Sequence, residues 1–202
     1  MTAADPIARA RRLADRPGRA LLGITGAPGA GKSRLAAVLA AALPGSVVVP
    51  MDGYHLTTAE LATRGWVAER GTPRTFDADG YVAMLRALRS GAPVLAPTFD
   101  RSREEPVPAA IPVPVDIRLV ITEGNYLLVD ELPWSAIPGL LDEIWFVEAS
   151  EEVRLQRLVA RHVEFGRAPE EAWERAITGS DADNARLVAA TRSRADFIVA
   201  TG

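Results

Sequence analysis

The sequence predicts an α/β fold in which one parallel β-sheet is covered by helices on both faces. Short apolar segments of strand type alternate along the chain with longer segments whose apolar residues recur every three or four positions. A glycine-rich turn separates the first strand segment from the helix that follows it, as in a strand–helix crossover between parallel strands. With 202 residues and 48% hydrophobic residues, the chain is expected to form a single domain over residues 1–202.

In the first half of the chain, three apolar runs predict strands. They occupy residues 20–25, 46–50 and 94–99. Helices are predicted where apolar residues recur at helical spacing until proline and glycine stop the pattern. They occupy residues 6–14, 34–43 and 79–89. Residues 51–79 follow no period and contain several glycines, so we expect a functional segment there that is partly helical around residues 58–63.

The second half of the chain continues the alternation. Residues 100–114 contain four prolines, which predicts an extended excursion or a hairpin. Runs rich in β-branched and aromatic residues predict strands at residues 117–122, 143–148 and 196–200. Amphipathic spacing predicts helices at residues 151–162, 169–177 and 181–192. Because strands and helices alternate, the strands are expected to run parallel.

Residues 26–33 fit the pattern G-x-x-x-x-G-K-[ST] at every fixed position. The eight residues are Gly26, Ala27, Pro28, Gly29, Ala30, Gly31, Lys32 and Ser33. In such a loop the backbone N–H groups and the helix N-terminus bind phosphates, the lysine reaches the β- and γ-phosphates, and the serine hydroxyl binds Mg²⁺. An ordinary glycine-rich turn is the alternative, but Lys32 is the only lysine among the 23 lysines and arginines of the chain. We therefore predict a nucleotide-binding P-loop that continues into Arg34.

Composition excludes several other kinds of protein. A net charge of −3 is not that of a nucleic-acid-binding surface. Without cysteine, and with His55 and His162 as its only histidines, the chain has no disulfide framework and is not expected to hold zinc. It contains no apolar run of 18 residues and no apolar leader segment, so we expect a cytoplasmic protein with no membrane partner.

Two acidic residues follow predicted strands. Asp52 comes after the strand at residues 46–50, and Glu123 comes after the strand at residues 117–122. Ligands of an open parallel sheet bind outside the carboxyl ends of its strands. Each acid alone is as well explained by capping of a loop. Two of them beside a P-loop strand favour phosphoryl transfer, which needs one carboxylate at the attacking hydroxyl and another near Mg²⁺.

Four motifs in this order resemble the phosphoribulokinase/uridine kinase/pantothenate kinase family over nearly the whole chain. They are residues 26–33, Met51-Asp52-Gly53-Tyr54-His55, Pro97-Thr98-Phe99-Asp100 and Thr122-Glu123-Gly124-Asn125-Tyr126-Leu127-Leu128. The resemblance implies a parallel sheet of the P-loop NTPase type with an added lid segment. It also implies a kinase that uses ATP and Mg²⁺ to phosphorylate a hydroxyl of a small metabolite. Its partners would then be a nucleotide and a small-molecule acceptor, and a homodimer is common in this family.

The resemblance also implies roles for individual residues. Lys32 and Asp52 would be catalytic, with Asp52 as the general base for the acceptor hydroxyl. Glu123 would be the Walker-B-type acid that holds Mg²⁺ together with Ser33. An insertion at about residues 54–77 would contribute to the acceptor site. The implied acceptor-binding residues are Asp52, Tyr54, His55, Arg74, Phe99, Asp100, Asn125, Tyr126 and Asn184, the last of which is equally well explained as a helix-surface residue.

Three arginines of the predicted helix at residues 151–162 lie on one side of it. Arg154, Arg157 and Arg161 fall within an arc of about 60° at 100° per residue. A solvated basic face is the alternative explanation. In the family, however, an arginine-rich helix leads into a lid that closes over the phosphates. The resemblance therefore implies a lid at about residues 161–168, with Arg157 and Arg161 as catalytic phosphate contacts.

Other nucleotide-binding proteins are weighed by their motifs. A regulatory GTPase needs an Asn-Lys-x-Asp motif, which a chain with a single lysine in its P-loop does not contain. A nucleoside monophosphate kinase shares the P-loop and an arginine lid, and a nucleotide-binding regulatory protein without turnover is a third interpretation. The acceptor is open among nucleoside, pantothenate, sugar and glycerate types. Arg64, Arg70 and Arg74 either bind a carboxylate or phosphate of the acceptor or face solvent.

Overall fold

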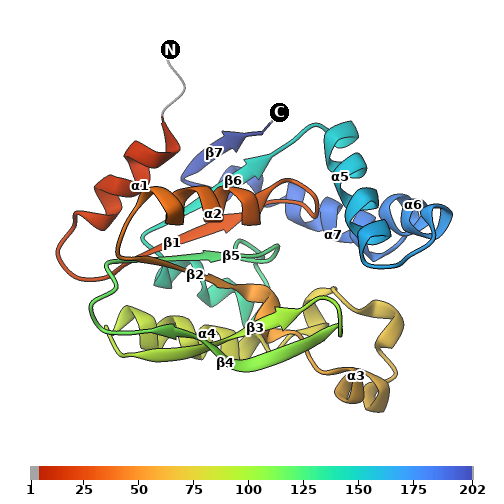
Figure 1. Cartoon of the computed structure of the whole chain (residues 1–202), viewed down its shortest axis with the longest axis horizontal. Helices are drawn as coiled ribbons and strands as arrows, with labels where there is room; N and C mark the ends of the chain where they lie inside the picture. Colours follow the sequence, from red (N-terminus) through yellow and green to blue (C-terminus); the bar gives the residue numbers. More distant parts are fainter. Residues whose placement is uncertain (1–4, 202) are drawn as a thin grey trace.

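The computed structural model describes residues 5–201, and its centre is a five-stranded sheet in the order β2–β5–β1–β6–β7 (Figure 1). The strands are β1 Ala20–Thr25, β2 Ser46–Pro50, β5 Leu119–Glu123, β6 Glu143–Glu148 and β7 Phe197–Ala200. Every neighbouring pair runs parallel. The predicted parallel α/β sheet is therefore confirmed, and its first strand lies in the middle.

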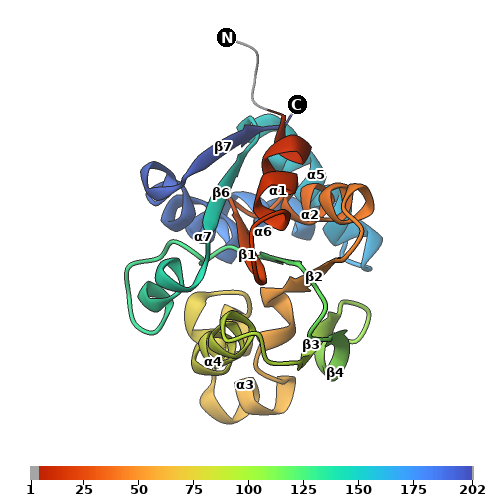
Figure 2. The same cartoon turned by 90° about the vertical axis from the view of Figure 1, so that its left-hand side faces the viewer.

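Helices lie on both faces of this sheet, as the sequence predicts. The helices of the described residues are α1 Pro6–Ala14, α2 Lys32–Ala42, α3 Thr58–Arg64, α4 Ala78–Arg89, α5 Glu151–Glu164, α6 Pro169–Thr178 and α7 Ser180–Ala189. Figure 2 shows α1 and α2 on one side of the sheet and α3 and α4 on the other. None of the helices within the described part of the chain is long and apolar enough to cross a membrane.

Alternate residues of the central strands face two separate apolar cores. Leu22 and Ile24 of β1 pack with Leu39 of α2 in one cluster. Leu21 of β1 packs with Leu85 of α4 in the other. All six residues of β1 are buried because both of its faces are covered. This double burial explains why the strands of the sequence are continuous apolar runs without polar alternation.

One predicted strand lies outside the central sheet. β3 (Val94–Asp100) and β4 (Glu105–Val113) pair antiparallel in a two-stranded sheet of their own. Residues 100–114, expected to form an extended excursion or a hairpin, supply the turn and the second strand of a hairpin, and the predicted strand at residues 94–99 is its first strand and does not join the parallel sheet. The prolines of β4 have no N–H to donate, which suits a strand that has β3 as its one neighbour among the described strands. The turn at residues 101–104 joins the two strands.

The expected partial helix of residues 51–79 is α3. It begins with a capping box, in which the Thr57 side chain accepts from the Glu60 backbone N–H and the Glu60 carboxylate accepts from the Thr57 backbone N–H. It ends at Gly65, whose φ of 71° is the left-handed conformation that glycine adopts without strain. Three short 3₁₀ turns complete the segment, so it is ordered by local hydrogen bonds.

One buried hydrogen bond ties α4 to the sheet and yields a stability prediction. The Tyr81 hydroxyl lies 2.6 Å from Thr122 Oγ1, which itself donates to the Val49 carbonyl oxygen at 2.7 Å. Tyr81→Phe should lower the free energy of unfolding by about 1 kcal/mol, and Thr122→Val by about 2 kcal/mol because it leaves two buried groups without a partner. Urea unfolding of both variants checks this order, and equal stability of both variants and the parent chain would contradict it.

Candidate active site

The loops that follow β1, β5 and β2 meet at one edge of the sheet, because these three strands are parallel neighbours. Glu123 at the end of β5 is in register with Ile24 of β1 and with Pro50 of β2. The P-loop follows β1, and Asp52 follows β2. A pocket of about 230 Å³ lies at this edge, and its lining includes four of the predicted residues, Lys32, Ser33, Asp52 and Glu123.

The P-loop wraps around a buried lysine. At Gly29, with a φ of 82°, a Cβ would lie 2.5 Å from the Arg154 carbonyl oxygen, so only glycine fits. The Lys32 ammonium donates to the carbonyl oxygens of Gly26 at 2.9 Å and Ala27 at 3.2 Å. Burial lowers the pKa of Lys32 to about 8, and Glu123 opposes this shift. A buried cation bonded to neutral carbonyl groups fits an anionic ligand such as a nucleotide phosphate.

Ser33 and Glu123 form a pair that fits Mg²⁺. Ser33 is in the first turn of α2, and its hydroxyl donates to Glu123 Oε1 at 2.9 Å. Burial, together with the nearby Asp52 carboxylate, raises the pKa of Glu123. A cation beside these oxygens would offset that repulsion. Mg²⁺ prefers hard oxygen ligands and in kinases is held by one or two protein groups together with substrate phosphates, so one hydroxyl and one carboxylate suffice.

Asp52 lies across the pocket from the P-loop and forms an ion pair with Arg101. Arg101 Nη2 donates to Asp52 Oδ2 at 2.5 Å from the turn between β3 and β4. Burial acts to raise the pKa of Asp52, but His55, Arg101 and Lys32 outweigh it and hold the pKa below its usual range. Asp52 is therefore ionised at neutral pH, which is the state that a general base needs.

Three aromatic rings form one wall of the pocket beside Asp52. The His55 ring lies 4.0 Å from Phe76 and 4.5 Å from Phe99, measured between ring centroids. His55 Nδ1 lies 2.8 Å from the Asp52 backbone oxygen. Burial lowers the pKa of His55, so its ring is neutral at pH 7. All three rings line the pocket and offer an apolar surface to the carbon skeleton of an acceptor.

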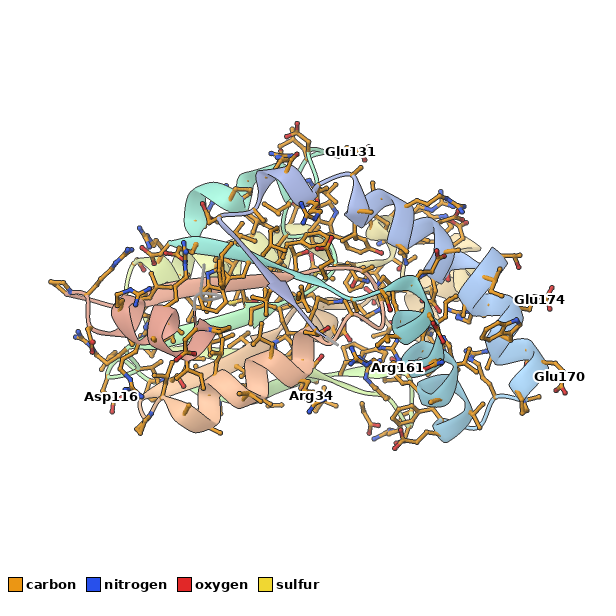
Figure 3. The ribbon with its side chains drawn as sticks, turned by 90° about the horizontal axis from the view of Figure 1, so that it is seen from above. Arg34, Asp116, Glu131, Arg161, Glu170 and Glu174 are labelled. Carbon is orange, nitrogen blue, oxygen red and sulfur yellow. The ribbon has the colours of Figure 1, made fainter. Side chains whose placement is uncertain are left out.

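The arginines of α5 occupy different positions relative to the pocket. Arg161 lines it and lies on the side of α5 that faces the sheet (Figure 3). Arg157 Nη1 instead donates to the Ala30 carbonyl oxygen at 3.4 Å and to Thr201 Oγ1 at 3.3 Å, beside the P-loop. Arg154 is buried against the same loop, with Nη1 3.4 Å from the Pro28 carbonyl oxygen. Arg34 is exposed and projects from the outer side of α2 (Figure 3).

The pocket also has a distal end, where α5, α6 and α7 meet residues 70–71 of the insertion. We use this name for the surface formed by Gly71, His162, Arg175, Asp181 and Asn184, all of which line the pocket. Asn184 Nδ2 donates to the Gly71 carbonyl oxygen at 2.8 Å, and the Tyr126 hydroxyl donates to the same oxygen. These two bonds hold the insertion against α7 and against the loop that follows β5.

Four predicted acceptor-binding residues do not line the pocket. Tyr54 packs edge-on against Tyr81 in the core, and Tyr126 is fully buried behind the Gly71 carbonyl group. Arg74 forms an ion pair with Glu69 and stacks on Trp66. Asp100 caps the β3–β4 turn, where its carboxylate accepts from the backbone N–H of Ser102. Asp52, His55, Phe99, Asn125 and Asn184 do line the pocket, and their roles stay predictions.

The structure adds side chains that the sequence did not single out. Arg101 carries the ion pair to Asp52, and Arg175 and Asp181 line the distal end. Arg101 directly follows the motif Pro97-Thr98-Phe99-Asp100, so its position beside this motif is the signal by which the sequence could have indicated it. Arg175 and Asp181 follow the predicted lid on two surface-type helices, where no spacing distinguishes them from solvated residues.

Comparison with known proteins shows which family the chain resembles. The model of the phosphoribulokinase/uridine kinase family matches residues 21–202. The ATP-dependent kinase-like protein notR′ from Aspergillus versicolor is 39% identical over 145 residues, which are 67% of this chain and 84% of that protein. A proposed uridine kinase from Schizosaccharomyces pombe is 37% identical over 181 residues, which are 83% of this chain and 77% of the relative.

A solved structure shows the same fold at similar identity. The crystal structure of a proposed fructose transport system kinase from Silicibacter sp. TM1040 superposes with a TM-score of 0.84 and 39% sequence identity. The match covers 92% of this chain and 91% of the other. The fold, the P-loop and the family match over residues 21–202 lead to one conclusion. The chain belongs to the phosphoribulokinase/uridine kinase family of P-loop kinases.

Proposed function

We propose that the protein is a phosphotransferase that moves the γ-phosphoryl group of ATP to a hydroxyl of a small metabolite in the presence of Mg²⁺. The observation that carries this proposal is the pairing of two sites in one pocket. An ionised carboxylate, Asp52, lies in the same pocket as the P-loop lysine, Lys32. A hydroxyl beside Asp52 would therefore face a phosphate held by Lys32.

The proposed transfer forms one bond and breaks one bond, and it releases one proton. A bond forms between the acceptor oxygen and the γ-phosphorus as the bond to the β-phosphate oxygen breaks, and ADP leaves with that oxygen. The hydroxyl proton passes to Asp52. Bound Mg²⁺ would neutralise phosphate charge, and Ser33 and Glu123 would hold it. Arg161 and Lys32 would bind the phosphoryl oxygens, where charge accumulates during transfer.

In this proposal the aromatic wall and Asn125, which line the pocket, would hold the acceptor with its hydroxyl at Asp52. The names of two relatives suggest uridine and fructose as candidate acceptors, and the sequence alternatives add pantothenate and glycerate. A panel of these four compounds with Mg-ATP in a coupled ADP-release assay tests the proposal. We expect one compound to raise ADP release at least tenfold over ATP alone. Slow ADP release that no compound accelerates would instead favour a nucleotide-binding regulatory protein.

Substitution of Ser33 tests the predicted metal site. Ser33→Ala removes the hydroxyl that donates to Glu123 and would bind Mg²⁺. Loss of a metal-site group typically weakens metal affinity by about 10–100-fold. We expect the Mg²⁺ concentration for half-maximal rate to rise at least tenfold, while ATP binding measured in EDTA stays within about twofold. Ser33→Thr, which keeps the hydroxyl, is the control, and an unchanged Mg²⁺ requirement in Ser33→Ala would contradict the assignment.

A further inference from the structure

The carboxylates near the distal end of the pocket already have hydrogen-bond or ion-pair partners. Asp181 Oδ2 lies 2.8 Å from His162 Nε2 and 3.7 Å from Arg175 Nε. Glu104, on the β3–β4 turn, pairs with Arg167 at 3.4 Å and with Arg70 at 3.8 Å. The remaining acid on this side, Asp52, is bound by Arg101 and is needed for the reacting hydroxyl. A neutral acceptor with several hydroxyl groups would donate several hydrogen bonds. Because these carboxylates already have partners, this end of the pocket is less suited to such an acceptor.

Hydrogen-bond donors, by contrast, are left over at the same end. Arg175 Nη2 donates to the Arg70 carbonyl oxygen at 3.3 Å, but Arg175 Nε is buried without a hydrogen-bond partner among the described residues. The Arg175 side chain is partly exposed, and its Nη1 makes no hydrogen bond with the described residues, so Nη1 can donate to a ligand in the pocket. The ion pair of Arg101 with Asp52 uses only Nη2, which leaves further N–H groups of that guanidinium for a ligand.

The charges around the distal end of the pocket also favour an anionic ligand. Besides Lys32 and Arg161, four arginines line the pocket: Arg70, Arg101, Arg167 and Arg175. They face three carboxylates: Asp52, Glu104 and Asp181. One positive charge is therefore unmatched at the acceptor side. A ligand group that only accepts hydrogen bonds and carries negative charge complements both the charge and the donors.

We infer that the phosphate acceptor is a hydroxy compound that itself carries an anionic group, a carboxylate or a phosphate monoester, and that Arg175 binds this group at the distal end. The acceptor hydroxyl then lies beside Asp52, and the skeleton between the two groups packs on His55, Phe76 and Phe99. This inference rests on the proposed function and narrows it. It favours a hydroxy acid or a sugar phosphate over a free nucleoside or a free sugar.

Matched pairs of acceptors test the inference directly. Each pair shares a hydroxyl and differs in the anion: glycerate with glycerol, pantothenate with pantothenol, and fructose 6-phosphate with fructose, with uridine added as a neutral nucleoside. In the ADP-release assay we expect one anionic member to exceed its neutral partner in kcat/KM by about 100-fold. The first two pairs report a carboxylate, and the third reports a phosphate. Preference for a neutral compound would overturn the inference while leaving the proposed kinase intact, whereas no acceptor-dependent turnover would overturn both.

Substitution of Arg175 connects the preference to the distal end. Arg175→Gln should raise the KM for the anionic acceptor about 30-fold or more, with kcat and the KM for ATP within about twofold. Arg175→Lys should restore part of the affinity because it keeps the charge. The matched control is Arg186→Gln on α7, an exposed arginine outside this pocket. An equal loss of affinity for ATP and for the neutral partner would show that Arg175 only supports the fold, and it would overturn the inference.

Discussion

Replacing Asp52 with asparagine should lower kcat by about 10²–10⁴-fold while ATP binding is retained. The carboxylate lies in the pocket beside the predicted acceptor position, and the low pKa set by His55, Arg101 and Lys32 against the effect of burial keeps it ionised at neutral pH. An amide of the same shape cannot take the hydroxyl proton. It also gives up the ion pair with Arg101 without removing volume from the pocket.

The Asp52→Asn result is interpretable only if nucleotide binding and folding are measured beside it. We expect the dissociation constant of ATP to change by less than about threefold, because Asp52 makes no bond to the P-loop among the contacts of the described chain. Asp183→Asn on the exposed surface of α7 is the matched control. Transfer at the parent rate in Asp52→Asn would exclude Asp52 as the general base.

Replacing Arg161 with alanine is expected to have the next largest effect, a loss of roughly 10²–10³-fold in kcat. Its guanidinium lines the pocket and makes no hydrogen bond or ion pair with another residue of the part described. Burial and the nearby Arg101 lower the pKa of Arg161, and this effect exceeds the opposite effect of the carboxylates Asp52, Glu123 and Asp181. An anionic ligand beside Arg161 would therefore stabilise its charged form. Loss of a preorganised donor to a transferring phosphoryl group typically costs about 3–4 kcal/mol of barrier.

Arg157 provides the comparison within the same helix. The resemblance assigns both arginines to phosphate binding, but Arg157 contacts the Ala30 carbonyl oxygen and Thr201 beside the P-loop. We therefore expect Arg157→Ala to raise the KM for ATP more than it lowers kcat, whereas Arg161→Ala lowers kcat. Steady-state kinetics with saturating acceptor separates the two parameters. Equal kinetic effects of the two substitutions would contradict the different positions of these side chains.

The sequence predicts the parts of the site that follow strands. Glu123 ends β5, Asp52 follows β2, and Lys32 begins α2 after the P-loop that follows β1, so their convergence is a consequence of parallel topology and short loops. The P-loop is the most specific of these patterns, because its glycines and its lysine have one physical explanation. Tyr54 and Asp100 are each next to a residue that lines the pocket, His55 and Phe99 respectively. They do not line the pocket themselves, because neighbouring residues of a loop or strand end point in opposite directions.

The sequence cannot predict side chains that reach the pocket from elements distant in the chain. Arg101 meets Asp52 only because the β3–β4 hairpin lies outside the central sheet, and the sequence did not predict that separation. Arg175 and Asp181 reach the distal end through the packing of α6 and α7 against α5, which amphipathic spacing alone does not determine. The predicted lid therefore contributes to the pocket through its following helices as well as through its arginines.

In the proposed reaction the γ-phosphoryl group of ATP is transferred to a hydroxyl oxygen and not to water. ³¹P NMR of a reaction with Mg-ATP and the best acceptor of the panel measures this directly. We expect a new phosphate monoester resonance that grows in step with ADP, and we expect it to be absent in Asp52→Asn under the same conditions. Growth of inorganic phosphate alone, at a rate that no acceptor changes, would contradict it.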